Sequence, residues 1–299
     1  MKVLVIGTRG QLARSLSEAA SARQLPIRLI GRPDLDLSDV HGMRTAITAA
    51  QPGVVINAAA YTAVDRAESD AIAAFAVNAA APEAMAQACE DLGVPFVHIS
   101  TDYVFDGTKD APYVEDDPAA PLGIYGRSKL DGEQRVAAAC ARHLILRTAW
   151  VHSPFGSNFV RTMLRLAATR SEIAVVDDQV GNPTYAPHLA SAILTLTERL
   201  MDDCDVPWGL YHLAGSGEAT WCDLAREVLA VSSQLGGPTA SVRAITTAEY
   251  PTAARRPANS RLDCSRARRL LGIGLPHWQE GVAQCVARLL PDVCAERAE

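Results

Sequence analysis

Tyr125 and Lys129 are two residue types that together can move a proton, and they lie four positions apart. On a helix, residues four apart share one face, so a phenol hydroxyl and an ammonium group can approach the same point. A free phenol has a pKa near ~10, and a nearby positive charge lowers that pKa because it favours the phenolate. The pair therefore predicts a tyrosine that acts as a proton donor. Taken alone, it also fits a surface helix with a solvated lysine and a half-buried tyrosine.

The amino-terminal segment reads as strand, glycine turn and helix, which is the order that a dinucleotide site requires. Residues 2–6 are an apolar run of strand length, Gly7 and Gly10 follow, and apolar residues then recur at helical spacing. Gly7 permits a tight turn, and Gly10 lets backbone N–H groups approach a pyrophosphate at the helix N-terminus. Ala13 stands where a third glycine often packs the helix against the strand. A glycine turn is also ordinary loop chemistry, so the surrounding pattern decides between the two interpretations.

That pattern is an alternation of short apolar runs with longer helical stretches. Strands are predicted at residues 2–6, 26–30, 54–57, 94–99 and 143–147, and the clearest helices at 67–92 and 124–140. The alternation predicts an α/β fold, a Rossmann-like doubly wound parallel sheet. Ligands of such sheets bind beyond the carboxyl ends of the strands, where most of the unusual polar residues of this chain fall.

The pattern loosens after Trp150. We expect residues 1–150 to form a dinucleotide-binding domain and residues 151–299 mainly a smaller substrate-binding domain, with some segments returning to the sheet. Helices are predicted at 159–169, 188–201 and 221–234, and a strand at 172–176. The segment 255–261 holds the densest basic charge in the chain. It is either a solvated loop or, beside a cofactor cleft, a clamp for a diphosphate.

Composition excludes several classes of protein. The net charge of −6 and dispersed arginines argue against a nucleic-acid partner. No apolar run approaches the ~20 residues that span a bilayer, and the apolar start is too short for a signal peptide. The seven cysteines are odd in number and have no C-x-x-C spacing, so we expect reduced thiols in a cytoplasmic enzyme.

These motifs together resemble the extended short-chain dehydrogenase/reductase superfamily, and within it the dTDP-4-dehydrorhamnose reductase family. The tyrosine–lysine pair and the glycine turn mark only the superfamily. The Ser-Thr-Asp-Tyr-Val-Phe loop at 100–105 and the Arg-Pro-x-Asn-Ser segment at 256–260 are much more specific in combination. The similarity runs nearly end to end, through residues 7–12, 57–68, 100–107, 125–133, 147–151, 181–184, 209–213 and 256–262.

The resemblance implies reduction of the C4 ketone of a dTDP-4-keto-6-deoxy sugar, which gives dTDP-L-rhamnose. Tyr125 would protonate the developing alkoxide, and Lys129 would lower the pKa of Tyr125 and bond the nicotinamide ribose. Thr101 would donate a hydrogen bond to the same oxygen; alternatively, it is a strand-end threonine that bonds its own backbone. No metal ligands are expected, because residues 185–188 lack the carboxylate that metal-bridged dimers of the family supply there.

On the substrate side, the resemblance implies that Asp102 and Tyr103 reach the sugar and that Trp150 offers a flat wall for the hexose. Trp150 equally fits a core position between the domains. Arg256 would contact the diphosphate.

The cofactor choice depends on the end of the second strand, where an acidic residue favours NAD and an arginine accommodates a 2′-phosphate. Arg32 occupies the nearer position, so we expect NADPH, with NADH possible. Asp36 and Leu37 would border the adenine. The remaining cofactor contacts that the resemblance implies are Gly7, Gly10, Gln11, Leu12, Ala60, Tyr61, Thr62, Ile99, Tyr125 and Lys129.

Two other functions stay open at this point. The regulatory subunit of methionine adenosyltransferase shares the fold and much of the pattern without being known to reduce a sugar, and a reductase of opposite facial selectivity would give 6-deoxy-L-talose. The expected assembly is a monomer or a homodimer.

Overall fold

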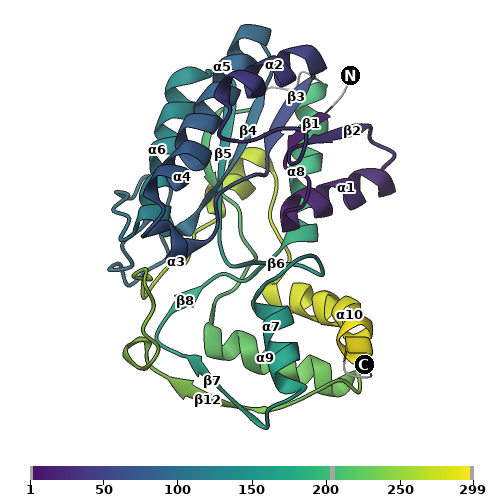
Figure 1. The fold of residues 1–299 in the computed structure, drawn as a ribbon, viewed down its shortest axis with the longest axis vertical. Coiled ribbons are helices and arrows are strands. Elements are labelled where there is room, and N and C mark those ends of the chain that lie inside the picture. Colours follow the sequence, from purple (N-terminus) through teal and green to yellow (C-terminus); the bar gives the residue numbers. More distant parts are fainter. Residues whose placement is uncertain (1–2, 203–205, 297–299) are drawn as a thin grey trace.

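The computed structural model describes residues 3–202 and 206–296, and it has two parts (Figure 1). The larger part holds a six-stranded sheet in the order β10-β5-β4-β3-β1-β2, and every neighbouring pair is parallel. The predicted Rossmann-like α/β fold is therefore confirmed. Its strands are β1 (Val3–Ile6), β2 (Ile27–Ile30), β3 (Val54–Asn57), β4 (Phe96–Thr101), β5 (His143–Thr148) and β10 (Gly209–His212).

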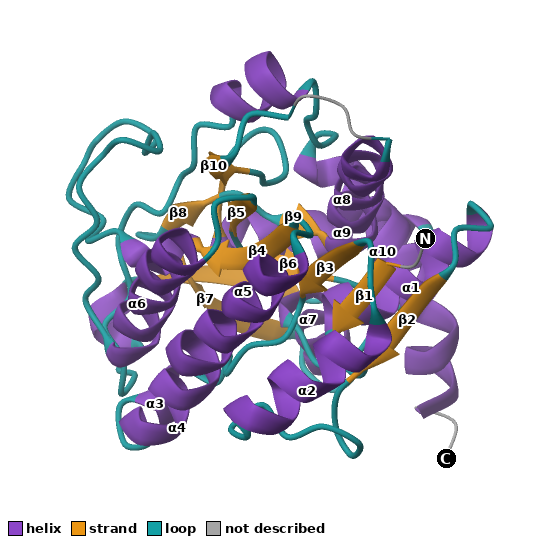
Figure 2. Ribbon diagram, turned by 90° about the horizontal axis from the view of Figure 1, so that it is seen from above, coloured by secondary structure: helices purple, strands orange, loops and turns teal. Residues whose placement is uncertain are grey.

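The inner strands β1, β3, β4 and β5 form a largely buried middle layer, which explains why they read as continuous apolar runs. In β1, Val3 and Val5 pack into one hydrophobic core, and Leu4 and Ile6 pack into another on the opposite face. Figure 2 shows helices on both faces. They are α1 (Gln11–Ala22) and α8 (Ala186–Met201) on one face, and α2 (Val40–Ala50), α5 (Ala81–Leu92) and α6 (Ile124–Ala139) on the other.

The predicted helix at 67–92 is wrong in detail. The segment is broken into α3 (Val64–Ala67), α4 (Ala71–Phe75), a π-helical turn (Ala76–Ala80) and α5. The wider turn brings the Asn78 backbone against Gly132 of α6, where any side chain would overlap the Asn78 carbonyl oxygen. The Asn78 side chain then bonds the backbone of Tyr61 and the hydroxyl of Ser128. The π-helical turn therefore joins the loop that follows β3 to α6.

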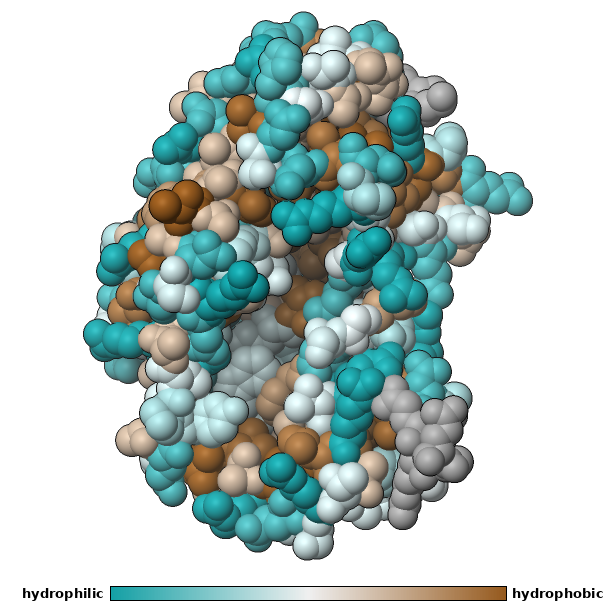
Figure 3. Space-filling model, in the orientation of Figure 1, coloured by the Kyte–Doolittle hydropathy of each residue, from teal (hydrophilic) through white to brown (hydrophobic). Residues whose placement is uncertain are grey.

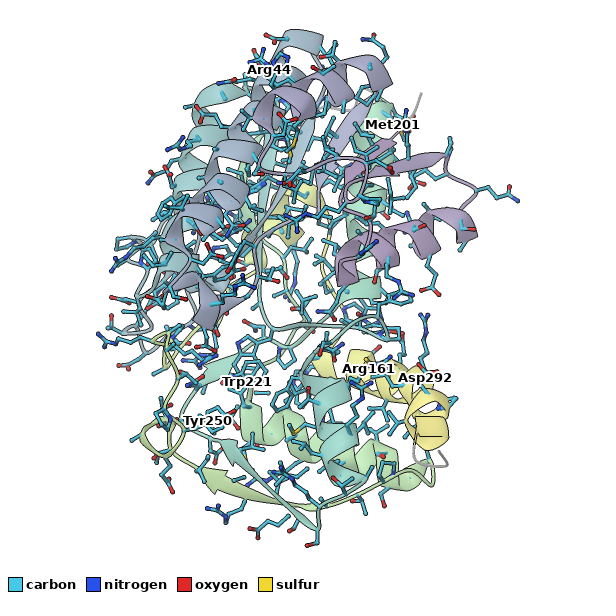
Figure 4. All side chains as sticks on the ribbon, in the orientation of Figure 1. Arg44, Arg161, Met201, Trp221, Tyr250 and Asp292 are labelled. Atoms are coloured by element: carbon cyan, nitrogen blue, oxygen red, sulfur yellow. The ribbon has the colours of Figure 1, made fainter. Side chains whose placement is uncertain are left out.

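The smaller part is built from later segments. Here α9 (Trp221–Gln234) and α10 (Trp278–Glu296) pack on α7 (Phe159–Ala167), and Figure 4 shows Arg161 of α7 beside Asp292 of α10. Short strands complete it: β6 (Val151–His152), β7 (Glu172–Val176), β8 (Val180–Gly181), β9 (Thr184–Tyr185), β11 (Ala219–Thr220) and β12 (Ser241–Ile245). The chain also returns to the large sheet, because β10 pairs with β5.

Five cysteines, at positions 89, 140, 222, 264 and 285, are buried free thiols. Cys204 and the side chain of Cys294 lie outside what the structure describes. Among the described residues, no helix is long and apolar enough to cross a membrane.

A buried ion pair ties α6 to the sheet behind the carboxyl end of β4. Arg147 of β5 donates to both carboxylate oxygens of Glu133, at 2.9 and 2.6 Å, and the Ser100 hydroxyl donates to the same carboxylate. Both charged side chains are at most 5% exposed. Each charge has lost its water, so each depends on the other for compensation.

Glu133→Gln should therefore destabilise the protein strongly. Removing one member of a buried pair leaves the other charge uncompensated, so we expect a loss of about 3–5 kcal/mol in the free energy of unfolding. Denaturant titration measures it. The matched control is Glu18→Gln, which breaks the exposed pair with Arg288 and should cost no more than about 1 kcal/mol. Equal losses for the two variants would contradict this account of the pair.

Candidate active site

A cleft of about 900 Å³ lies between the two parts of the molecule. Its wall is formed mainly by the loops that follow β1, β2, β3, β4 and β5, together with Lys129 of α6 and Trp221 of α9. Figure 3 shows the hollow running between the upper and lower halves of the surface. This is the position at which parallel α/β sheets bind their ligands.

Most of the site residues predicted from the sequence line this one cleft. They are Gly7, Gly10, Gln11, Leu12, Arg32, Leu37, Ala60, Tyr61, Thr62, Ile99, Thr101, Asp102, Tyr103, Tyr125, Lys129 and Trp150. Two predicted residues are not in the lining. Asp36 accepts hydrogen bonds from the backbone N–H and hydroxyl of Ser38, and Arg256 is paired elsewhere. Their contacts to cofactor and substrate stay predictions.

Tyr125 meets the end of β4 at Thr101. Burial raises the pKa of Tyr125 to about 12, and the neighbouring Thr101 hydroxyl opposes that rise. Thr101 also donates to the Asp102 carboxylate at 3.0 Å and accepts from the Tyr103 N–H at 3.2 Å. The backbone bond that the alternative interpretation expected is thus present, but the same hydroxyl also faces Tyr125. The Thr101 hydroxyl therefore interacts with both the Tyr125 phenol and the Asp102 carboxylate.

Asp102 is a buried carboxylate beside these hydroxyls. Its Oδ1 accepts from Thr101, whereas its Oδ2 has no hydrogen-bond partner among the described atoms. Burial raises the pKa of Asp102 to about 7, against the opposing effects of the neighbouring Ser260 and Thr101 hydroxyls. The negative charge of Asp102 in turn raises the pKa of Tyr125.

The Lys129 side chain reaches the backbone of β4. Its nitrogen donates to the Ile99 carbonyl at 2.7 Å and lies 3.4 Å from Nε2 of His98. Burial lowers the pKa of Lys129 to about 8, and the charge of Glu133 opposes that change. These contacts were not foreseen from the sequence. That Lys129 lowers the pKa of Tyr125 stays a prediction.

The glycine turn has the geometry of an anion site. Gly7 adopts a positive φ of 119°, and the N-cap of α1 is Gly10, which brings no capping side chain to the first N–H groups of the helix. Gln11 has a second task that the sequence did not reveal. Its side chain bonds the Val151 carbonyl, the Ser153 hydroxyl and the Asn158 amide, so the turn is tied to the smaller part.

Trp150 lines the cleft together with Trp221, a residue that the sequence analysis did not single out. The two indoles stack with centroids 3.5 Å apart and planes within 3°. Figure 4 shows Trp221 at the start of α9, on the side facing the larger part. Gly181 makes room for the stack, since a side chain there would overlap the Trp150 ring. Trp150 therefore both lines the cleft and packs between the two parts.

Arg256 lies outside the cleft lining but close to it. It donates to the Asp65 carboxylate at 2.8 Å, and it interacts with the hydroxyl of Tyr103, which does line the cleft. The basic segment is thus neither fully solvated nor placed directly in the cleft. Within the part of the chain that the structure describes, no group of three acidic, histidine or cysteine residues could hold a metal ion.

Comparisons with known proteins agree over nearly the whole chain. The family described as "RmlD substrate binding domain" matches residues 1–290. A dTDP-4-dehydrorhamnose reductase of Sinorhizobium fredii is 46% identical over 97% of this chain and 98% of its own length. The reductase of Escherichia coli K12 is 41% identical over the same shares.

Solved structures show the same relationship. A Clostridium acetobutylicum dTDP-4-dehydrorhamnose reductase superimposes with a TM-score of 0.90 at 34% identity, covering 97% of this chain and 99% of its own. A Bacillus anthracis dTDP-4-dehydrorhamnose reductase, solved in complex with NADP, has a TM-score of 0.88 at 33% identity, covering 96% and 98%. The chain belongs to the RmlD substrate binding domain family, as its motifs predicted.

Proposed function

We propose that this protein is a dTDP-4-dehydrorhamnose reductase, which reduces the C4 ketone of dTDP-4-dehydro-L-rhamnose with NADPH and gives dTDP-L-rhamnose. The observation that carries the proposal is that Thr101, Tyr125 and Lys129 line the same cleft as the glycine turn, with the Thr101 hydroxyl acting on the pKa of Tyr125. The curated relatives of this name, at 46% and 41% identity over nearly the whole chain, support the substrate. A binding protein without catalysis would not need this set of residues, so the regulatory-subunit alternative is not favoured.

The reduction needs a hydride, which the nicotinamide supplies when bound, and a proton, which the protein supplies. NADPH fits the glycine turn and Arg32, which line the cleft, and the NADP complex of the B. anthracis relative supports this cofactor. The exposed Arg32 side chain does not block NADH, so we propose NADH as a possible second cofactor. Thr101 and Tyr125 would both donate to the C4 oxygen as negative charge develops there. Tyr125 then transfers its proton to that oxygen.

The substrate is proposed to lie between the Thr101–Tyr103 segment and the Trp150–Trp221 stack. A hexose presents C–H groups on one face, which an indole covers well, and hydroxyls at its edge, which a carboxylate can bind. Arg256 would reach the diphosphate only after a change of partner, because Asp65 holds it at 2.8 Å.

The experiment that tests the function is proton NMR of the product formed from dTDP-4-dehydro-L-rhamnose and NADPH. The expected product is dTDP-L-rhamnose. The coupling of H4 distinguishes it from the 6-deoxy-L-talose epimer, which would mean hydride delivery to the other face of C4. Absence of turnover would contradict the proposal.

The five buried free thiols support a reducing, cytoplasmic location, and we propose a monomer or homodimer.

Tyr125→Phe should lower kcat by about 10²–10⁴-fold, because the proton donor is lost while the cleft keeps its shape. The dissociation constant for NADPH, measured by fluorescence titration, should change little. Tyr61→Phe is a matched control for the loss of a cleft hydroxyl, because it removes the hydroxyl of another tyrosine in the lining, one that donates to Asp70. A Tyr125→Phe enzyme with half the normal kcat would exclude Tyr125 as the acid.

Arg32→Ala should raise KM for NADPH more than KM for NADH. The side chain is 67% exposed and its contact with Asp36 is long, at 3.7 Å, so it is available to a 2′-phosphate. For an exposed charge pair we expect a few-fold to tens-fold effect. Arg28→Ala, an exposed arginine on β2, serves as the control. Equal changes for both cofactors would place Arg32 away from the phosphate.

Asp102→Asn should stabilise the protein at pH 8 while lowering its activity. The pKa of Asp102 is raised in the folded state, so the folded protein binds its proton more tightly than the unfolded chain does. The cost of burying the charge is therefore small at pH 4, close to the ordinary pKa of an aspartate, and grows as the pH rises to about 7. At pH 8 we expect the variant to be more stable by up to about 4 kcal/mol. Urea titrations at both pH values measure it; an equal gain at pH 4 would contradict the assignment.

A further inference from the structure

A buried chain of polar groups runs from the end of β3 to Lys129, behind the catalytic tyrosine. The amide of Asn57 lies 3.1 Å from Nδ1 of His98, and Nε2 of His98 lies 3.4 Å from the Lys129 nitrogen. The exposed fractions of the three residues are 1%, 0% and 2%. Because these groups are shielded from water, each donor among them must meet an acceptor on its neighbour.

The amide of Asn57 is oriented by the backbone. Its Oδ1 accepts from the N–H of Ala59 at 3.1 Å, so its NH₂ group faces His98 and donates to Nδ1. A neutral imidazole carries one proton, which must then sit on Nε2. That N–H points at Lys129. An ammonium has no lone pair with which to accept it.

Two arrangements satisfy these groups. In the first, Lys129 is a neutral amine: it accepts from Nε2–H and donates to the Ile99 carbonyl. In the second, Lys129 is an ammonium and donates to both Ile99 and a bare Nε2. The ring proton is then on Nδ1, and Asn57 turns its carbonyl toward it and releases the Ala59 N–H. The net change is one proton gained by Lys129, with the ring neutral throughout.

We propose that His98, oriented by Asn57, is a positioning residue whose tautomer is coupled to the charge of Lys129. Because of this coupling, protonation of Lys129 breaks the hydrogen bond that the Ala59 N–H donates to Asn57. Ala59 lies in a loop that lines the cofactor cleft. The coupling gives Lys129 two defined states. The inference rests on the proposed function only for the role of Lys129 in the reaction.

The surrounding groups are consistent with a ring that stays neutral. Burial, the charge of Lys129 and the neighbouring His143 all lower the pKa of His98 well below its usual value. Burial lowers the pKa of Lys129 to about 8, within reach of ordinary buffers. His143 of β5 acts on His98, and Glu133 of α6 acts on Lys129. Arg147 of β5 pairs with Glu133, and Tyr125 and Asp102 line the same cleft as Lys129.

NMR can observe both groups directly, because the chain has only three lysines, at positions 2, 109 and 129. Protein labelled with ¹³C at lysine Cε and ¹⁵N in the histidine rings is titrated from pH 6 to pH 10, with Lys2→Arg and Lys109→Arg used for assignment. We expect His98 to change from the Nδ1–H to the Nε2–H tautomer at the same midpoint as the Lys129 signal. A single tautomer at every pH, while Lys129 titrates, would overturn the proposal.

Two variants separate coupling from simple burial. His98→Gln offers Lys129 an acceptor independent of Asn57, so the Lys129 midpoint should rise by about one pH unit. Asn57→Asp accepts from Nδ1 and should hold His98 in the Nδ1–H tautomer at every pH. His143→Gln is the matched control, because it removes a histidine on the adjacent strand that has no contact with Lys129 and should leave the tautomer change in place. An unchanged Lys129 midpoint in folded His98→Gln would contradict the coupling. None of these readouts uses turnover, so their failure leaves the proposed reductase activity untouched, and the reverse also holds.

Discussion

The arrangement of the site depends on one constraint, which is that polar groups at the carboxyl end of β4 are buried and must be satisfied by protein atoms. Over four residues the strand presents His98 to Lys129, the Ile99 carbonyl to the same side-chain nitrogen, Ser100 to Glu133 and Thr101 to Tyr125. Each contact reaches α6. The strand and the helix therefore fix each other, and the tyrosine is held by the same bonds that compensate the buried charges.

That constraint requires α6 to lie very close to its neighbours. Gly126 sits where a side chain would overlap the Tyr103 carbonyl, and Gly132 where one would overlap the Asn78 carbonyl. The two glycines let the helix approach the Thr101–Tyr103 segment on one side and the π-helical turn on the other. A wider separation would pull Lys129 away from Ile99 and leave Glu133 and Arg147 without full compensation.

The sequence predicted the parts of the site that have a short local signature. The glycine turn, the Tyr125–Lys129 spacing and the strand–helix alternation each need only a few neighbouring residues to be recognised. It did not predict contacts whose partners lie far apart in the chain. The Trp150–Trp221 stack joins residues 71 positions apart, and Gln11 bonds residues about 140 positions away. The helix at 67–92 was predicted unbroken, because alanine-rich segments favour helix and the π-helical turn is imposed by tertiary contact with α6.

Gln11 also connects the two sides of the cleft, because it belongs to the larger part and bonds residues of the smaller part. It is the first residue of α1, next to the N–H groups proposed for the pyrophosphate, and its side chain holds the loop at 151–158. Arg288 of α10 adds a second link, because it pairs with Glu18 of α1 and lies over Phe155. The helix α1, which begins at the glycine turn, is thus bonded to the smaller part at two places. Since the Trp150–Trp221 stack belongs to that part, we propose that α1 sets the distance between nicotinamide and sugar together with the Thr101–Tyr103 segment.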